Sequence, residues 1–294
     1  MPDKELYKFY SLGNRCTKND CPDSDKSKLN TITSNRLFLS SISMFNDPFE
    51  GSIDYPHERF ALENIESFDN DKDTDIRNRL IKNISNYSKR QIIAEISSMS
   101  PESQIKIYEQ YNTCGNEVIR INSECSLLIT CFSKLEEINE SSEIGCDINN
   151  IGNRDYNVLT SIIMWSHYAN SHKGICIKYK IPESADIYPH IYDVEYTDTY
   201  TELSTDDFKV LLNNSIENSS TNKTEQAEKN KYKNILIDRL CKKTTQWEYE
   251  KESRIIISNK DKLVKEEQGK YFVDFNYIDE IYFGLYTDEN VCKR

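Results

Sequence analysis

The sequence predicts an α+β fold, in which a mixed, mostly antiparallel sheet forms the core and two helical groups are inserted. About eight short segments have the alternating or β-branched pattern of strands. Two longer segments carry apolar residues at helical spacing, and they do not alternate regularly with the strands as in a doubly wound fold. The chain has only eight glycines and no phosphate-cradling glycine loop, which argues against a dinucleotide fold of that type and against a P-loop.

A length of 294 residues fits one large domain or two. We expect a single domain over residues 1–294, with a helical insert at about 58–120 and a polar, partly helical insert at about 203–243. The formal net charge of −12 disfavours non-specific binding to nucleic acid or to an anionic membrane. Nine cysteines are scattered singly, without a Cys-x-x-Cys motif, and no signal peptide or long apolar run is present. We therefore expect free thiols in a reducing cytoplasm and no bound metal.

The first predicted elements are a strand over Lys4–Tyr10, a short helix near Leu29 and Ile32, and a strand over Arg36–Ser41. Residues 45–50 follow with the sequence Phe-Asn-Asp-Pro-Phe-Glu, in which Asp47 and Pro48 have the order of a helix N-terminus. Two interpretations remain open for this segment. It is a capped turn, or it is part of a site, because Asn46 and Glu50 are more polar than such a turn requires.

Later elements follow the same kinds of pattern. A helix capped by Asp155 or Asn157 runs to Ala169 and carries His167 away from its apolar stripe, so this histidine is either a packed, hydrogen-bonded residue or a site residue. The other predicted segments are helices within 58–111 and 205–246, a polar loop over 134–154, and strands at 126–133, 174–181, 191–196, 271–275 and 278–285.

The segment from Trp247 to Ser258 is predicted as one strand that ends in three isoleucines. In a strand, side chains alternate between faces, so the carboxylates of Glu248, Glu250 and Glu252 would share one face with Arg254. These charges either form the solvated face of an edge strand or line a cleft. The tryptophan that opens the segment and the apolar residues that close it favour the cleft.

Several short motifs lie along the chain, at Leu6–Phe9, Phe45–Glu50, Met164–Ala169, Lys173–Cys176, Lys243 with Trp247-x-Tyr-Glu-x-Glu-x-Arg254, and Ile278–Gly284. Taken together, they resemble a bacterial family catalogued as a domain of unknown function (number 2971). The resemblance implies a shared fold over nearly the whole chain and no particular activity.

Tyr7 or Lys8 lies on the first predicted strand, Ser40 or Ser41 on the second, and Glu250 with Glu252 on a late one. This layout also resembles that of ADP-ribosyltransferases, which place polar or aromatic residues on two early strands and a Glu-x-Glu on a late strand. This resemblance implies cleavage of NAD, in which a fixed carboxylate stabilises an oxocarbenium-like cation and a second one orients or deprotonates an acceptor.

These considerations define one candidate site. We expect residues 45–50, His167 and residues 250–254 to converge on one pocket, with Arg254 paired to Asp47 or Glu50 rather than to Glu252. Trp165, Tyr168 or Trp247 would form an aromatic wall for nicotinamide. The candidate catalytic residues are Glu252, Glu250 and His167, and the candidate NAD-binding residues are Tyr7, Lys8, Ser40, Asn46, Trp165, Tyr168 and Arg254.

Three kinds of function remain open. The first is an enzyme that acts on NAD, a small nucleotide, as a transferase to a macromolecular acceptor or as a glycohydrolase, in the manner of a bacterial defence or toxin effector. The second is a nuclease or other hydrolase that uses His167 with Asn46, Asp47 and Glu50. The third is a non-catalytic sensing or binding module, in which the same motifs hold the sheet together.

Overall fold

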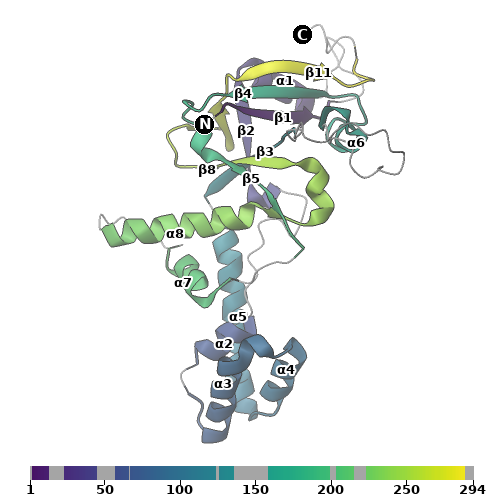
Figure 1. The fold of residues 1–294 in the computed structure, drawn as a ribbon. Coiled ribbons are helices and arrows are strands. Elements are labelled where there is room, and N and C mark those ends of the chain that lie inside the picture. Colours follow the sequence, from purple (N-terminus) through teal and green to yellow (C-terminus); the bar gives the residue numbers. More distant parts are fainter. Residues whose placement is uncertain are drawn as a thin grey trace. The chain divides into compact units, whose positions relative to one another are not determined.

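The fold is that of a computed structural model, which describes residues 2–12, 23–44, 57–65, 67–123, 126–135, 158–198, 203–214 and 223–288 (Figure 1). The chain divides into two compact units. Unit 1 consists of Met1–Asp47, Ser126–Asp198 and Cys241–Arg294, and unit 2 consists of Pro48–Cys125 and Thr199–Leu240. Both predicted inserts fall in unit 2, except that residues 241–243, at the end of the second, belong to unit 1.

Unit 1 is built on an antiparallel sheet with the strand order β11-β4-β1-β3-β2-β10-β9. Off this path, β8 also pairs with β3, and β5 pairs with β8. A separate parallel pair joins β6 (Glu195–Tyr196) to β7 (Lys242–Lys243). The strands of the large sheet are β1 (Lys4–Tyr10), β2 (Arg36–Ser41), β3 (Leu127–Ser133), β4 (Ile175–Ile181), β5 (Ile191–Asp193), β8 (Glu252–Ser258), β9 (Val264–Glu267), β10 (Lys270–Asp274) and β11 (Ile278–Phe283).

In β2, the alternation seen in the sequence decides which face is buried. Leu37 and Leu39 are almost fully buried, whereas Arg36 and Phe38, on the other face, are partly exposed. The buried face joins the main core, to which α1 (Asp23–Thr33) contributes Ile32 and, at its margin, Leu29. The predicted strands at residues 4–10 and 36–41 are confirmed with these bounds.

A second cluster of unit 1 lies where α6 (Ile162–Tyr168) packs against β1. Its buried residues include Tyr7, Met164 and Trp165. The predicted helix is shorter than expected, because a 3₁₀ turn at Val158–Thr160 comes first and the Ser161 side chain then accepts a hydrogen bond from the Met164 amide. Asp155 and Asn157, the predicted caps, lie outside the described residues.

Unit 2 is helical and has its own core, which includes Leu62, Ile76, Leu80 and Ile107. Its helices are α2 (His57–Glu63), α3 (Asp71–Asn83), α4 (Lys89–Ser97), α5 (Pro101–Ser123), α7 (Thr205–Asn214) and α8 (Lys223–Leu240), with a 3₁₀ turn at Ile84–Asn86. Polar caps fix where two of them begin: the Asn70 side chain accepts from the Asp73 amide, and Ser88 with Gln91 forms a capping box before α4.

The α+β prediction is confirmed, but the predicted strand from Trp247 to Ser258 begins too early. Trp247 does not open a strand, because Thr245–Glu250 forms a 3₁₀ helix and β8 begins only at Glu252. Lys251 separates them in the left-handed region, with φ of 44°. Glu248 and Glu250 therefore do not belong to the strand face that carries Glu252 and Arg254.

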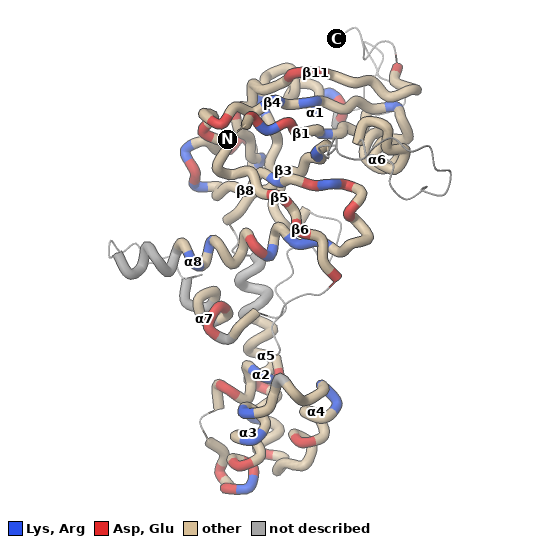
Figure 2. Tube along the Cα trace, in the orientation of Figure 1, with Lys and Arg blue, Asp and Glu red and all other residues tan. Residues whose placement is uncertain are grey.

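Two expectations fall on residues outside the described ranges: the Asn-Asp-Pro turn at 45–50 and all but the first residues of the loop at 134–154. In the described part of the chain, no helix is both long enough and apolar enough to cross a membrane. Acidic and basic residues are interspersed over the described elements of both units (Figure 2).

Candidate functional site

Four charged residues of unit 1 are buried together at the start of β8. Lys243, Glu250, Glu252 and Arg254 each expose 8% or less of their surface, and Arg254 exposes none. We call these four residues the charged cluster. Lys243 comes from β7, Glu250 from the end of the 3₁₀ helix, and Glu252 and Arg254 from β8. Buried ions are costly unless they are paired and hydrogen-bonded, and each member of this cluster is paired.

The left-handed residue Lys251 is what allows both carboxylates to meet one cation. It ends the 3₁₀ helix between Glu250 and Glu252, so the two side chains approach Lys243 from different elements. The Lys243 Nζ lies 2.6 Å from Glu250 Oε2 and 3.2 Å from Glu252 Oε2. The ammonium also lies 4.8 Å from the centre of the Trp247 ring. The Glu-x-Glu spacing thus brings the carboxylates together, although not through strand alternation.

Arg254 holds Glu252 in a two-point pair. Its Nε donates to Glu252 Oε1 at 2.8 Å and its Nη2 donates to Glu252 Oε2 at 2.9 Å. This geometry fixes both the position and the orientation of the carboxylate. The expectation that Arg254 avoids its strand neighbour is therefore wrong. Residues two apart on a strand share a face, and here that proximity decides the pairing; Asp47 and Glu50 lie outside the described residues.

The two carboxylates have opposite pKa shifts. Burial raises the pKa of Glu250, and the attraction of Lys243 offsets this only in part. Burial acts in the same direction on Glu252, but the charge and hydrogen bonds of Arg254, helped by Lys243, outweigh it and lower the pKa of Glu252 to about 2. Glu252 is therefore held ionised, whereas the pKa of Glu250 lies above its ordinary value.

Two tyrosines and a cysteine complete the surroundings of the carboxylates. The Tyr168 hydroxyl donates a short hydrogen bond to Glu250 Oε1. The Tyr196 hydroxyl accepts one from the Glu252 amide at 2.8 Å. The Cys131 side chain is hydrogen-bonded to Glu252. Burial raises the pKa of both tyrosines and of the Cys131 thiol, so these groups stay neutral and act as hydrogen-bonding partners.

Lys8 on β1 adds a third positive charge close to Glu252. Its Nζ donates to Thr130 Oγ1 and to the Cys131 carbonyl, both at 2.8 Å. Burial lowers the pKa of Lys8, and its neighbours Cys131 and Glu252 oppose that change. Lys8 thus links strands β1 and β3 to the electrostatics of the charged cluster.

The other predicted site residues lie elsewhere or serve packing. Tyr7 is 2% exposed in the core beside α6, and Trp165 is 7% exposed and donates its indole N–H to the Leu159 carbonyl. Ser40 pairs with Ile129 in the middle of the sheet. His167 is exposed, with its ring 6.5 Å from that of Tyr249. Asn46 lies outside the described residues.

The structure therefore brings together five of the predicted residues, namely Lys8, Tyr168, Glu250, Glu252 and Arg254. Sequence reasoning gave no role in the site to Lys243, Cys131 or Tyr196. The signal for Lys243 was its place in the motif with Trp247 and Arg254 that resembles the family. Nothing in the local pattern identified Cys131 or Tyr196, because they reach Glu252 through pairing with distant strands.

Most of this geometry falls within one recognisable stretch of the chain. Residues 164–255 match the family model described as a protein of unknown function (DUF2971). The predicted resemblance is confirmed for this region. The DUF2971 region contains all four members of the charged cluster together with Tyr168 and Tyr196. Comparison with curated proteins gave no match, and neither did comparison with solved structures.

The residue types in the cluster are those of acid–base and electrostatic chemistry rather than of a metal centre. In the described ranges, no group of three or more His, Cys, Asp or Glu side chains is arranged to hold a metal ion. Glu252 can present a fixed negative charge, and Glu250 with Tyr168 can accept or donate a proton.

Proposed function

We propose that this chain is an enzyme that cleaves the bond between nicotinamide and ribose in NAD, as an ADP-ribosyltransferase or an NAD glycohydrolase. The observation that carries the proposal is the pair Glu250 and Glu252, two buried carboxylates that share Lys243 and have pKa values shifted in opposite directions. Neighbouring carboxyl groups tuned in this way commonly take different roles in one reaction.

Glu252 is the proposed electrostatic catalyst. When the glycosidic bond breaks, its electron pair leaves with nicotinamide, and the ribose C1′ becomes cationic. A carboxylate that is already fixed and ionised stabilises that charge without having to reorganise. The two hydrogen bonds from Arg254 supply the fixation, and the low pKa of Glu252 keeps the carboxylate charged.

Glu250 is the proposed proton acceptor. After nicotinamide has left, water or an acceptor hydroxyl adds to C1′ and must lose a proton. A carboxylate whose pKa is raised is a stronger base than an ordinary one, and its contact with the Tyr168 hydroxyl fixes its position. Trp247 and Tyr249, whose rings lie 6.0 Å apart beside the cluster, are suitable for stacking on nicotinamide.

The direct test is to incubate the purified chain with NAD and to measure free nicotinamide by chromatography, with and without a protein acceptor. Glu252→Gln keeps the shape of the side chain and removes its charge, so turnover should fall on the order of 10²–10³-fold. Glu248→Gln is the matched control, because Glu248 is an exposed glutamate of the same 3₁₀ helix. If the wild type releases no nicotinamide, or if Glu252→Gln releases it at the wild-type rate, the proposal is wrong.

A wider role follows if the enzyme is active. An NAD-cleaving defence or toxin effector should lower the NAD content of a bacterial host that expresses it, and Glu252→Gln should not. Unchanged NAD content during expression of an enzyme that is active in vitro would contradict this role.

The second candidate is a non-catalytic sensing or binding module, and one observation favours it. Glu252 is 4% exposed, and its carboxylate is hydrogen-bonded to Arg254, Lys243 and Cys131. A network in which every charged group is hydrogen-bonded would equally well serve only to hold β7, β8 and β3 together. In that case, Glu252→Gln should lower the melting temperature, and no NAD turnover should be measured in any variant.

A further inference from the structure

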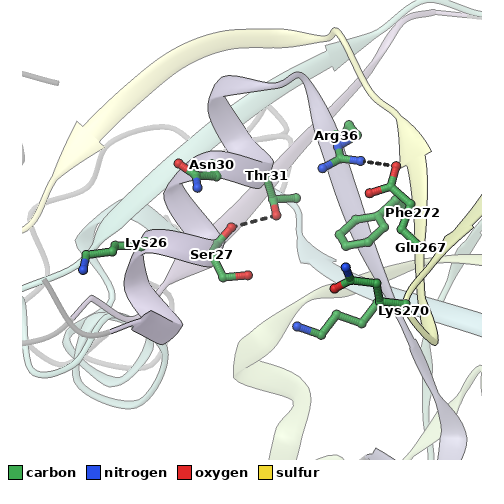
Figure 3. Close-up of a pocket in the computed structure, with 9 residues that line it drawn as sticks. Lys26, Ser27, Asn30, Thr31, Arg36, Glu267, Lys270 and Phe272 are labelled. Atoms are coloured by element: carbon green, nitrogen blue, oxygen red, sulfur yellow. Dashed lines mark hydrogen bonds and ion pairs between the residues drawn. The ribbon is translucent and has the colours of Figure 1, made fainter.

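A second feature of unit 1 lies at the end of the sheet formed by β2, β10 and β9, whereas β4 and β11 form the other end. A pocket of about 700 Å³ is lined there by α1, β2 and the β9–β10 hairpin (Figure 3). We call it the hairpin pocket. It is lined by Lys26, Ser27, Asn30, Thr31, Arg36, Glu267, Gln268, Lys270 and Phe272.

The charge of the hairpin pocket is opposite to that of the whole chain. Its lining includes the cations Lys26, Arg36 and Lys270 and a single carboxylate, Glu267. The chain as a whole has a formal net charge of −12. Three cations gathered around one hollow in such an acidic protein repel one another, and an anion between them would remove that repulsion.

Arg36 is already held in position within the pocket. Its guanidinium lies 4.7 Å from the centre of the Phe272 ring, and its Nη1 donates to Glu267 Oε1 at 2.6 Å. The Arg36 Nε is buried and has no hydrogen-bond partner among the described residues. A buried donor without a partner is costly, and a ligand oxygen would satisfy it.

The strand register places a second carboxylate near Arg36, but that carboxylate is engaged by another lysine. Arg36 is paired with Asp274 across β2 and β10, so the two side chains point to the same face. Asp274 is instead bound by Lys265, whose Nζ lies 2.5 Å from its Oδ2. Glu267, with half of its side chain exposed, is the one carboxylate that lines the pocket.

We propose that the hairpin pocket binds a phosphate-bearing small molecule. Arg36 would donate to two phosphate oxygens with its planar fork, and Lys26 and Lys270 would supply point charges from the two sides of the hollow. The polar side chains of Ser27, Asn30 and Gln268 line the same hollow and suit the remaining phosphate oxygens. A tetrahedral anion with more than one charge fits three dispersed cations better than a single carboxylate does. This proposal does not depend on NAD cleavage.

The test uses inorganic pyrophosphate and the full-length chain in calorimetric titration at low ionic strength. The wild type should bind one pyrophosphate per chain. Arg36→Gln should weaken binding by about tenfold or more, since one charge-assisted contact is worth that much. Lys270→Gln alters only an exposed side chain and should weaken binding by about severalfold. Glu267→Gln removes the competing carboxylate and should tighten binding.

Arg79→Gln is the control, because Arg79 is an exposed arginine of unit 2 that pairs with Glu95 at 2.5 Å, as Arg36 pairs with Glu267. It should bind pyrophosphate as the wild type does. A parallel titration with ADP identifies the source of the phosphate. Tighter binding of ADP indicates a nucleotide, and equal binding indicates recognition of the phosphates alone. If neither ligand binds, or if Arg36→Gln and Lys270→Gln both bind like Arg79→Gln, the proposal is overturned.

Discussion

At the scale of single residues, Arg254 is fully buried and its guanidinium is bound to Glu252. Arg254→Met should leave the Glu252 charge without its main partner and lower the free energy of unfolding by roughly 3–5 kcal/mol. The double variant Arg254→Met with Glu252→Leu should recover much of this loss, because apolar residues of similar size often replace a buried pair without cost. Urea denaturation of the three proteins measures this difference.

A double variant that is no more stable than Arg254→Met would contradict this explanation. It would mean that the lost stability comes from packing around the side chain and not from an uncompensated carboxylate.

Glu252 should also determine part of the acid sensitivity of the fold. Its pKa is about 2 in the folded chain, against roughly 4.3 in an unfolded one. The ionised form is thus favoured by folding. Its contribution, about 3 kcal/mol, is fully present above the unfolded pKa and is lost as the pH falls towards the folded pKa. Between pH 5 and pH 2, the wild type should lose more unfolding free energy than Glu252→Gln does.

The pKa shift of Glu250 has the opposite effect on stability. Because the pKa of Glu250 is raised, its contribution to stability is present at low pH and is lost as the pH rises through the pKa of the folded state. The comparison with Glu252→Gln separates the two, since Glu250 is present in both proteins. Parallel stability profiles in acid would show that Glu252 is not held ionised by its partners.

At the scale of elements, the junction between α6 and β4 depends on backbone that is held in an unfavourable conformation. Asn170, Ser171 and His172 all have positive φ, at 48°, 53° and 67°. Such residues persist only where surrounding contacts fix them. A side chain on Gly174 would overlap the carbonyl oxygen of Tyr10 at the end of β1, and one on Gly284 would overlap the carbonyl oxygen of His172.

We therefore expect Gly174→Ala to destabilise unit 1, by about 1–3 kcal/mol if the strands can shift. Gly115→Ala is the matched control, because Gly115 lies within α5 and a methyl group there meets no atom within 4 Å. That change should stabilise the protein by about 0.5–1 kcal/mol through helix propensity. Thermal unfolding of both variants measures the contrast, and a Gly174→Ala protein as stable as the wild type would contradict the close approach.

The strands of unit 1 also show how much of the fold could be predicted from the sequence. Alternation located β2, in which the buried Leu37 and Leu39 lie on one face. It also located β1, although Leu6 and Tyr7, on opposite faces of that strand, are both buried. It failed at Trp247–Glu250, because alternating charges fit an exposed strand and a 3₁₀ helix equally well. The left-handed turn at Lys251 that separates the two is carried by a residue with no special preference for it. The position of Glu252 relative to Tyr196, Cys131 and Lys243 depends on pairing between strands that are distant in the sequence, and no local pattern encodes that pairing.

At the scale of the whole molecule, the chain enters and leaves each compact unit more than once. Unit 2 joins Pro48–Cys125 with Thr199–Leu240, and within it the Phe60 and Phe208 rings lie 5.6 Å apart. Helical periodicity predicted both inserts, but not that they share a unit, because periodicity says nothing about contacts between remote segments. Unit 1 and unit 2 each have a separate apolar core.

Separate cores should give separate local stabilities. Leu80 is fully buried in unit 2, and Leu80→Ala should cost about 2–5 kcal/mol there. Leu39, 1% exposed in the main core of unit 1, provides the matched substitution Leu39→Ala. Native-state hydrogen exchange should show faster exchange in α3 and α5 for Leu80→Ala, with β3 and β8 unchanged, and the reverse for Leu39→Ala. If either substitution accelerates exchange equally in both units, the chain unfolds as one cooperative body.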